Sequence, residues 1–152
     1  MHLQIHRARP EQAETLTQIA LAAKAYWGYP ERWMELWKPQ LTFSSDYFEE
    51  NESWVAEMDQ APVGFCTLLE KDRNAWIENL WVTPEVIGKG VGKRLFLHAL
   101  ELSRQRGFGY LRLEADPNAA GFYEKMGMRK IGERKSEIEG EPRLLPLMEL
   151  RL

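Results

Sequence analysis

The sequence predicts an α/β domain in which helices flank one mixed β-sheet, and three features of the chain support this. Segments that alternate apolar and polar residues, as strands do, are interspersed with segments whose apolar residues recur at helical spacing. After an opening strand, the expected order is three helices, three strands, a helix, a strand, a helix and two strands, which is typical of such a layered domain. The length of 152 residues fits one domain over 1–152, without repeats or linkers.

The first fifty residues are expected to form one strand and three helices. Residues 3–7 alternate in polarity, and Pro10 suits the first turn of the helix that follows. That helix is expected to bury Leu16, Ile19, Ala20 and Ala23 and to end at Gly28. A second helix begins at Pro30 and places on one face Trp33, Leu36, Trp37 and Leu41. Ser44 or Ser45 caps a short third helix.

Strands dominate the rest of the chain. Residues 53–58 and 62–70 are predicted to form a hairpin, and residues 75–82 form a further strand. A loop at 83–90 leads into a long helix that stops at Gly107. A short strand at 110–115 and a capped helix at 116–127 follow, and strands at 128–134 and 144–152 complete the sheet around a polar turn at Gly140.

Composition argues against several classes of protein. The net charge of −3 gives no reason to expect nucleic acid or an anionic membrane as a partner, since a nucleic-acid-binding domain is usually basic overall. The single cysteine, Cys66, excludes an internal disulfide and a cysteine metal cluster, and its apolar surroundings favour a buried thiol over a reactive one. No apolar run approaches the ~20 residues of a membrane helix, and the N-terminus lacks the apolar core of a signal peptide. These features predict a cytoplasmic protein.

Three glycines between the strand at 75–82 and the long helix predict a phosphate site. Gly88, Gly90 and Gly92 allow positive φ angles and close approach of a ligand. The first amides of the following helix have no internal partner and favour an anion such as a pyrophosphate. Positive charge is added nearby by Lys89, Lys93 and Arg94.

Other interpretations of this loop fit less well. A P-loop needs Ser or Thr after its lysine, and here Lys93 is followed by Arg94. A dinucleotide fingerprint needs the spacing G-x-G-x-x-G early in the fold, and these glycines are spaced G-x-G-x-G after three strands. Two alternatives stay open, a flexible turn that only caps the helix and a nucleotide-binding module that holds a different diphosphate.

Two motifs resemble the GNAT superfamily of N-acetyltransferases. The stretch LWVTPEVIGKGVGKRL at 80–95 is similar to the family's pattern V-x-P-E followed by Q/R-x-x-G-x-G/A, and the residues in register are Leu80, Val82, Pro84, Glu85, Gly90 and Gly92. The stretch DPNAAGFYEKMGM at 116–128 is similar to N-x-x-A-x-x-x-Y-E-K/R-x-G-F through Ala119, Phe122, Tyr123, Glu124, Lys125 and Gly127. The resemblance covers residues 52–135 well and the first fifty residues only in layout.

Three positions depart from the family's patterns. Ile87 stands where Arg or Gln is usual, Asp116 where Asn is common, and Met128 where Phe is common. The departure at Ile87 weakens the match only slightly, since the loop binds phosphate mainly through backbone amides. Asn118 is a candidate to replace the amide missing at Asp116.

The resemblance implies a GNAT-like acyl-CoA N-acyltransferase fold with acetyl-CoA as co-substrate and no metal. Its mixed, mostly antiparallel sheet of about seven strands would splay between two central parallel strands, here 76–82 and 110–114, and admit the pantetheine arm. The backbone of 80–82 would bind that arm, and the amides of 88–93 would hold the pyrophosphate. The residues expected at the cofactor are Leu80, Trp81, Val82, Ile87, Gly88, Lys89, Gly90, Val91, Gly92, Lys93, Asn118, Phe122 and Tyr123.

The expected reaction is acetyl transfer by direct attack of an amine in a ternary complex. Tyr123 is the candidate acid for the leaving thiolate, because a phenol is protonated at neutral pH; alternatively it only packs the arm. The Val82 amide is a candidate donor to the oxyanion. The base would be Glu78, Glu114 or an ordered water, although either carboxylate could instead be solvated or paired with Arg112. The spacing of His2, His6 and His98 gives no metal site.

The acceptor would be a small-molecule, peptide or protein amine. Its candidate binding residues are the aromatic side chains Tyr26, Trp27, Tyr29 and Trp33. Rings at helical spacing usually face a core, so these side chains could instead only pack against the sheet or a partner subunit. In a third arrangement Trp33 and Trp37 are buried, and the earlier rings line the acceptor pocket. A non-catalytic acyl-CoA sensor on the same fold is the alternative function. The oligomeric state stays open, although homodimers are common in similar proteins.

Overall fold

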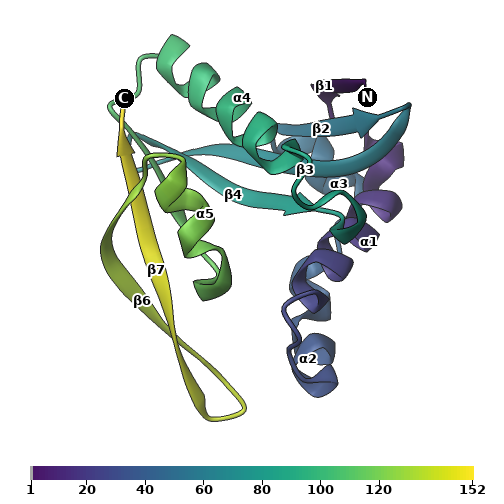
Figure 1. The fold of residues 1–152 in the computed structure, drawn as a ribbon, viewed down its shortest axis with the longest axis vertical. Helices are drawn as coiled ribbons and strands as arrows, with labels where there is room; N and C mark the ends of the chain where they lie inside the picture. The colour runs from purple at the N-terminus through teal and green to yellow at the C-terminus, as the bar shows by residue number, and fades with distance from the viewer. Residues whose placement is uncertain (1) are drawn as a thin grey trace.

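The computed structural model describes residues 2–152, which form one seven-stranded sheet with helices on both faces (Figure 1). The strands are β1 (Leu3–Arg7), β2 (Ser53–Met58), β3 (Ala61–Lys71), β4 (Asn74–Val82), β5 (Tyr110–Glu114), β6 (Arg129–Ile138) and β7 (Glu141–Arg151). The helices are α1 (Ala13–Ala25), α2 (Glu31–Leu41), α3 (Ser45–Glu50), α4 (Val91–Gln105) and α5 (Ala120–Lys125). Short 3-10 turns lie at Pro10–Gln12, Pro84–Val86 and Pro117–Ala119.

The mixed sheet predicted from the sequence is confirmed. The strands lie in the order β1-β2-β3-β4-β5-β7-β6, and only the β4–β5 pair is parallel among the described strands. The helix α4 joins these two strands, as a parallel connection requires. None of the helices in residues 2–152 has the length and apolarity that crossing a membrane requires.

The sheet is split at its centre, where β4 and β5 diverge. These strands pair only at Ala75–Leu111 and Trp76–Arg112, although β4 continues to Val82. Beyond these pairs, the edge of β4 facing β5 has no strand partner in the described part of the chain. Figure 1 shows the result, with β6 and β7 running away from the layer formed by β1–β4.

A bulge in β4 lies at the same place as the split. Thr67 of β3 pairs with Asn79, but the next residue, Leu68, pairs with Ile77, so Glu78 is an extra residue in the ladder. A bulge locally increases strand twist and redirects a side chain. The bulge therefore explains both the divergence of β4 from β5 and the outward, exposed position of Glu78.

Two apolar cores cover the two faces of the sheet. On one face Leu95 and Phe96 of α4 are fully buried with Cys66, which confirms the expected buried thiol. Burial raises the pKa of Cys66 to about 12, so the thiol is protonated and unreactive. On the other face Leu16 of α1 and Phe48 of α3 pack with Phe65, and these contacts fix α1 and α3 against β3.

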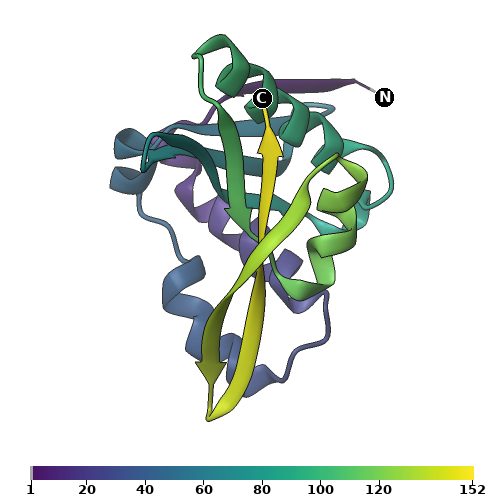
Figure 2. The ribbon, with the colours of Figure 1, turned by 90° about the vertical axis from the view of Figure 1, so that its left-hand side faces the viewer.

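Two local expectations were wrong. Leu36 was predicted on the buried face of α2, but 55% of it is exposed, because α2 contacts the rest of the molecule mainly through Trp33, Trp37 and Leu41. The strands β6 and β7 are longer than predicted and form a hairpin that extends beyond the sheet (Figure 2). The residues beyond the predicted ends, 135–138 and 141–143, are mostly polar and show no apolar alternation to indicate a strand.

Candidate functional site

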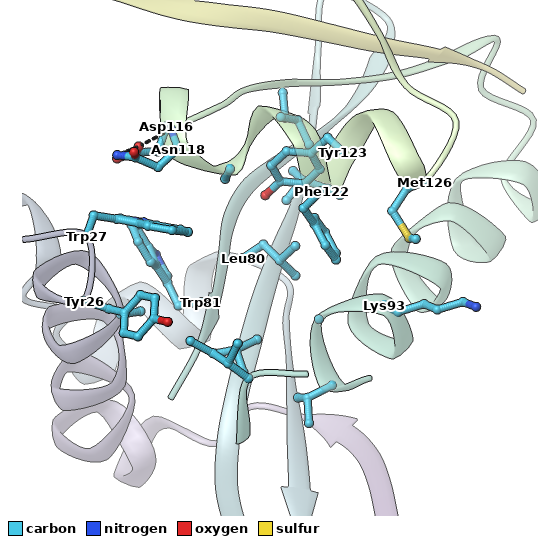
Figure 3. Close-up of a pocket in the computed structure, with 18 of the residues that line it drawn as sticks. Tyr26, Trp27, Leu80, Trp81, Lys93, Asp116, Asn118, Phe122, Tyr123 and Met126 are labelled. Atoms are coloured by element: carbon cyan, nitrogen blue, oxygen red, sulfur yellow. Dashed lines mark hydrogen bonds between the residues drawn. The ribbon is translucent and has the colours of Figure 1, made fainter. Parts of the chain in front are cut away.

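A cavity of about 640 Å³ lies at the split between β4 and β5 (Figure 3). Its walls come from the end of α1, the outer half of β4, the 86–93 loop, the end of β5, and α5 with the turn before it. The predicted cofactor residues all line it except Lys89, and the predicted catalytic residues Tyr123, Glu78 and Glu114 line it as well. Residues from both sequence motifs therefore meet in one cavity.

The glycine loop presents free backbone amides to this cavity. Gly88 and Gly90 have φ angles of 85° and 83°, and Gly90 caps the start of α4 in the left-handed conformation. Within residues 2–152, no backbone carbonyl accepts a hydrogen bond from the amides of Gly88, Gly90, Val91, Gly92 and Lys93. Such a set of donors at the start of a fifteen-residue helix suits a phosphate group.

The space around the loop also fits a bound diphosphate. A side chain at Gly88 or Gly90 would meet nothing within 4 Å, so the backbone lies open to an approaching ligand. At Gly92, in contrast, an added Cβ would lie 3.4 Å from the Phe122 ring, which closes that side of the cavity. The Lys93 ammonium extends away from the cavity, so any attraction to a ligand comes chiefly from the amides (Figure 3).

The outer edge of β4 offers further donors. The Thr83 amide donates to the Val63 carbonyl of β3 at 2.8 Å. Successive amides of a strand point to opposite edges, so the amides of Val82 and Leu80 point away from β3, toward the split. This arrangement can bind an extended amide-containing arm as an added strand does, and it leaves the Val82 amide free to face a reacting carbonyl.

Tyr123 projects from α5 into the cavity. Its hydroxyl points toward Leu80 and Trp27 in Figure 3, while its ring packs against Phe122 and Phe96 with centroid distances of 5.1 and 6.2 Å. No hydrogen bond joins the hydroxyl to another described residue, which leaves its proton available. Burial raises the pKa of Tyr123 above its ordinary value, so the phenol is a proton donor at neutral pH.

Of the two candidate bases, Glu78 has no cationic partner among residues 2–152. Its Oε2 accepts a hydrogen bond from the Tyr47 hydroxyl, and the side chain lines the cavity. Glu114 also lines the cavity, but its Oε2 lies 2.5 Å from Nε of Arg134. Arg112, the alternative partner considered for either carboxylate, instead pairs with Glu149 at 2.7 Å. Arg134 therefore occupies the Glu114 carboxylate, whereas Glu78 faces the cavity without a competing cation among residues 2–152, so the geometry favours Glu78.

The predicted acceptor residues divide into two pairs. Tyr26 and Trp27 line the cavity at the end of α1, with 54% and 40% of each residue exposed. Tyr29 and Trp33 do not line it. Trp33 packs on Tyr29 and Trp37 with ring-centroid distances of 6.0 and 5.9 Å, in an aromatic cluster beside the cavity. The structure thus brings together one pair of aromatic rings at the cavity mouth and uses the other pair in packing.

A buried ion cluster lies behind this mouth. Asp116 accepts hydrogen bonds from Lys24 at 2.6 Å and from the Tyr29 hydroxyl at 2.9 Å, and Arg143 lies 3.7 Å from the same carboxylate. Burial alone would raise the pKa of Asp116, but the hydrogen bond and charge of Lys24 outweigh it, so that pKa lies below its ordinary value. Burial lowers the pKa of Lys24, which Asp116 only partly offsets. This cluster joins α1, β7 and the turn after β5.

The ion cluster was missed in the sequence, although two signals were present. Lys24 continues the buried stripe of Leu16 and Ala20 at intervals of four, where an apolar residue is expected. Asp116 departs from the Asn of the motif. Asn118, the candidate to replace that Asn, lines the cavity but donates from its side chain to Tyr29 at 2.9 Å and to Asp116 at 3.0 Å.

The histidines lie away from the cavity. His6 is 3.1 Å from Glu57, and His98 packs on Trp54 with a centroid distance of 4.4 Å. Among residues 2–152, no group of three or more His, Cys, Asp or Glu side chains is placed to hold a metal ion.

Comparison with known proteins identifies relatives along the whole chain. Residues 16–128 match the model of the acetyltransferase (GNAT) family. Over 152 residues the chain is 34% identical to the peptidyl-lysine N-acetyltransferase YjaB of Salmonella typhimurium, covering 99% of this chain and 98% of that protein. The crystal structure of a GCN5-related N-acetyltransferase from Rhodopseudomonas palustris superposes with a TM-score of 0.85, at 26% identity and covering 100% and 97% of the two chains. The solution structure of apo YjaB from Escherichia coli superposes with a TM-score of 0.72 at 27% identity, covering 99% of this chain and 97% of that one.

Proposed function

This chain belongs to the GNAT family and is an acetyl-CoA-dependent N-acetyltransferase, and on that premise we propose that it acetylates the side-chain amine of lysine in a peptide or protein. The observation that carries the proposal is the meeting of three features in one cavity. These are the exposed rings of Tyr26 and Trp27, the carboxylate of Glu78 and the hydroxyl of Tyr123. The Salmonella relative, which matches over nearly its whole length, is named for the same acceptor.

The residues at the split fit acetyl-CoA, which supplies the activated acetyl thioester. The free amides of Gly88 and of residues 90–93 would bind its pyrophosphate, and the outward amides of Leu80 and Val82 would bind its pantetheine arm. Backbone donors dominate both contacts. This explains why Ile87, half exposed at the cavity wall, can replace the polar residue usual in the family.

Glu78 is the proposed base. An ammonium cannot attack a carbonyl until it loses a proton, and Glu78 accepts that proton at the cavity wall directly or through a water. Its position on the bulge of β4 brings the carboxylate to the split while the neighbouring backbone remains in the strand.

Two donors complete the proposed chemistry. The Val82 amide donates to the carbonyl oxygen as negative charge develops there during attack. As the C–N bond forms and the C–S bond breaks, Tyr123 donates its hydroxyl proton to the departing thiolate sulfur. The second proton of the amine nitrogen then restores the phenol through water, and Glu78 releases the first proton to solvent. The raised pKa of Tyr123 keeps this proton in place across the physiological range.

The cavity mouth supports a lysine side chain over a compact polar amine. A lysine carries four methylenes that pack on aromatic rings while its ammonium is attracted to their faces. Tyr26 and Trp27 pack edge to face at the end of α1 with a ring-centroid distance of 5.4 Å, and both line the same cavity as Glu78. Their exposure leaves room for the flanking peptide.

A panel of amines tests the acceptor. Released thiol is measured with acetyl-CoA and three probes: an N-terminally blocked peptide with one internal lysine, a peptide whose only amine is its N-terminal alanine, and putrescine. The lysine peptide is expected to react fastest, and the same peptide with acetyl-lysine is the blank.

Faster release with putrescine or the alanine peptide would refute lysine as the acceptor. Binding of acetyl-CoA without thiol release from any probe would instead favour the sensor function. Replacing Trp27 by Ala tests the mouth independently, since it should raise KM for the peptide roughly tenfold and leave KM for acetyl-CoA unchanged.

A further inference from the structure

Tyr47 contacts Glu78 from α3, a helix that contributes no residue to the lining of the cavity. Its hydroxyl donates to Oε2 of Glu78. Its ring packs on Phe43 and Phe48 with centroid distances of 5.0 and 5.3 Å, and Ser44 caps α3 by accepting from the Tyr47 amide. The phenol is therefore held in place by the core beneath it and by the start of its own helix.

The hydrogen bonds behind Tyr47 have a fixed direction. The Trp81 indole N–H can only donate, and it lies 3.1 Å from Oδ1 of Asn79, which fixes the orientation of that amide. Nδ2 of Asn79 then donates to the Tyr47 oxygen at 2.8 Å and to Oγ1 of Thr67 at 3.1 Å. Asn79 is only 8% exposed, so solvent competes little for these bonds.

The direction of these bonds determines where the Tyr47 proton points. Because the Tyr47 oxygen accepts from Asn79, its own hydrogen is directed to the carboxylate of Glu78. Burial raises the pKa of Tyr47 above its ordinary value, and the hydrogen bond to Glu78 adds to the shift, so Tyr47 keeps its proton. The series Trp81, Asn79, Tyr47, Glu78 thus donates in one direction and ends at Oε2.

We propose that Tyr47 is a positioning residue that holds Oε2 of Glu78 and leaves Oε1 to take the proton of the acceptor amine. The inference rests on the proposed role of Glu78 as base. During the reaction one proton moves from the ammonium nitrogen to Oε1, and Tyr47 retains its own on the phenol oxygen. Because Trp81 also lines the cavity, the same series ties the orientation of the base to the cavity wall.

Other titratable groups around the cavity are accounted for. Glu114 pairs with Arg134 and Asp116 with Lys24, so neither carboxylate depends on Tyr47. The remaining groups in the lining are Tyr26, Lys93 and Tyr123, none of which hydrogen-bonds to Glu78 within the described residues. If removal of the Tyr47 hydroxyl changes the acidic limb of the pH profile of kcat/KM, the change therefore reports on Glu78.

The test uses Tyr47→Phe, which keeps the packed ring and removes only the hydroxyl. With the fastest amine of the panel, kcat should fall roughly tenfold to a hundredfold, while KM for acetyl-CoA stays unchanged. The acidic limb of the pH profile of kcat/KM should move to higher pH, because the Glu78 carboxylate has lost a hydrogen-bond donor. Tyr110→Phe removes a hydroxyl outside the cavity and should match the wild type in kcat, in KM for acetyl-CoA and in the pH profile.

A double variant separates this inference from the base assignment. If the two residues act as one unit, Tyr47→Phe combined with Glu78→Gln should be no slower than Glu78→Gln alone. An inactive Glu78→Gln enzyme beside a Tyr47→Phe enzyme with the wild-type pH profile would overturn the positioning role and leave Glu78 as base. An active Glu78→Gln enzyme would overturn the base assignment and the positioning role with it.

Discussion

Tyr123 and Glu78 reach the cavity from different elements, Tyr123 from α5 and Glu78 from the bulge in β4. Both were predictable as candidates because each lies in a contiguous motif or on the strand beside one. Their surroundings were not predictable. The partners of Glu78 and Glu114 lie 31 and 20 residues away in sequence. Only the packing of α3 against β3 and the strand order β5-β7-β6 bring those partners close.

Replacing Tyr123 by Phe tests the residue proposed as the acid. We expect kcat to fall roughly tenfold to a thousandfold, because the thiolate then leaves without a proton donor. The ring remains, so calorimetric titration should give nearly wild-type affinity for acetyl-CoA. Unchanged kcat would remove Tyr123 from the acid role and leave it as packing for the arm.

The element that most depends on local sequence is the glycine loop. Three alternating glycines between a strand and a helix indicated the amide cradle, because positive φ at Gly88 and Gly90 is encoded by the residues themselves. The bulge of β4 gave a weaker signal, two adjacent polar residues, Glu78 and Asn79, in the middle of an apolar strand. The extension of β6 and β7 beyond the predicted ends gave none, since the added residues at 135–138 and 141–143 are mostly polar.

A valine at Gly90 should abolish binding of acetyl-CoA. The φ of 83° is strained for a β-branched residue, and the side chain would enter the open space beside the free amides. Gly109→Ala is the matched control, since that glycine has no positive φ and its Cβ would meet nothing within 4 Å. Wild-type affinity of the Gly90→Val protein for acetyl-CoA would refute the placement of the pyrophosphate.

The ion cluster should stabilise the contact of α1 with the turn after β5. Asp116→Ala leaves the nearly buried cations Lys24 and Arg143 without their anion, and we expect it to lower the free energy of unfolding by about 3 kcal/mol. Urea unfolding measures this loss. Glu133→Ala breaks a more exposed ion pair with Lys130 and should change stability by less than about 1 kcal/mol. Equal effects of the two substitutions would contradict a stabilising cluster.

At the scale of the whole molecule, the split sheet is tied together by contacts distant in sequence. The Lys24–Asp116 pair spans 92 residues, and Arg32 of α2 lies 2.5 Å from Glu139 at the tip of the β6–β7 hairpin. Figure 2 shows this hairpin reaching the level of α2. The overall sheet was predictable from the order of elements, whereas these contacts depend on how two distant segments meet around the cavity.

Stability should depend on Asp116 as pH falls. Its pKa is lower in the folded protein, so its contribution is fully present above the ordinary aspartate value of about 3.9 and is lost as pH falls through the folded-state pKa. Urea unfolding between about pH 2 and 7 should therefore show the stability difference between wild type and Asp116→Asn narrowing toward low pH. A constant difference would contradict an ionised Asp116 in the folded state.

The account depends above all on acetyl-CoA binding in the split between β4 and β5. Mapping amide shifts by NMR during an acetyl-CoA titration tests this directly, residue by residue. The largest changes are expected at Gly88, at residues 90–93, and at Leu80 and Val82. Saturable binding that leaves these amides unchanged and shifts residues elsewhere would contradict it.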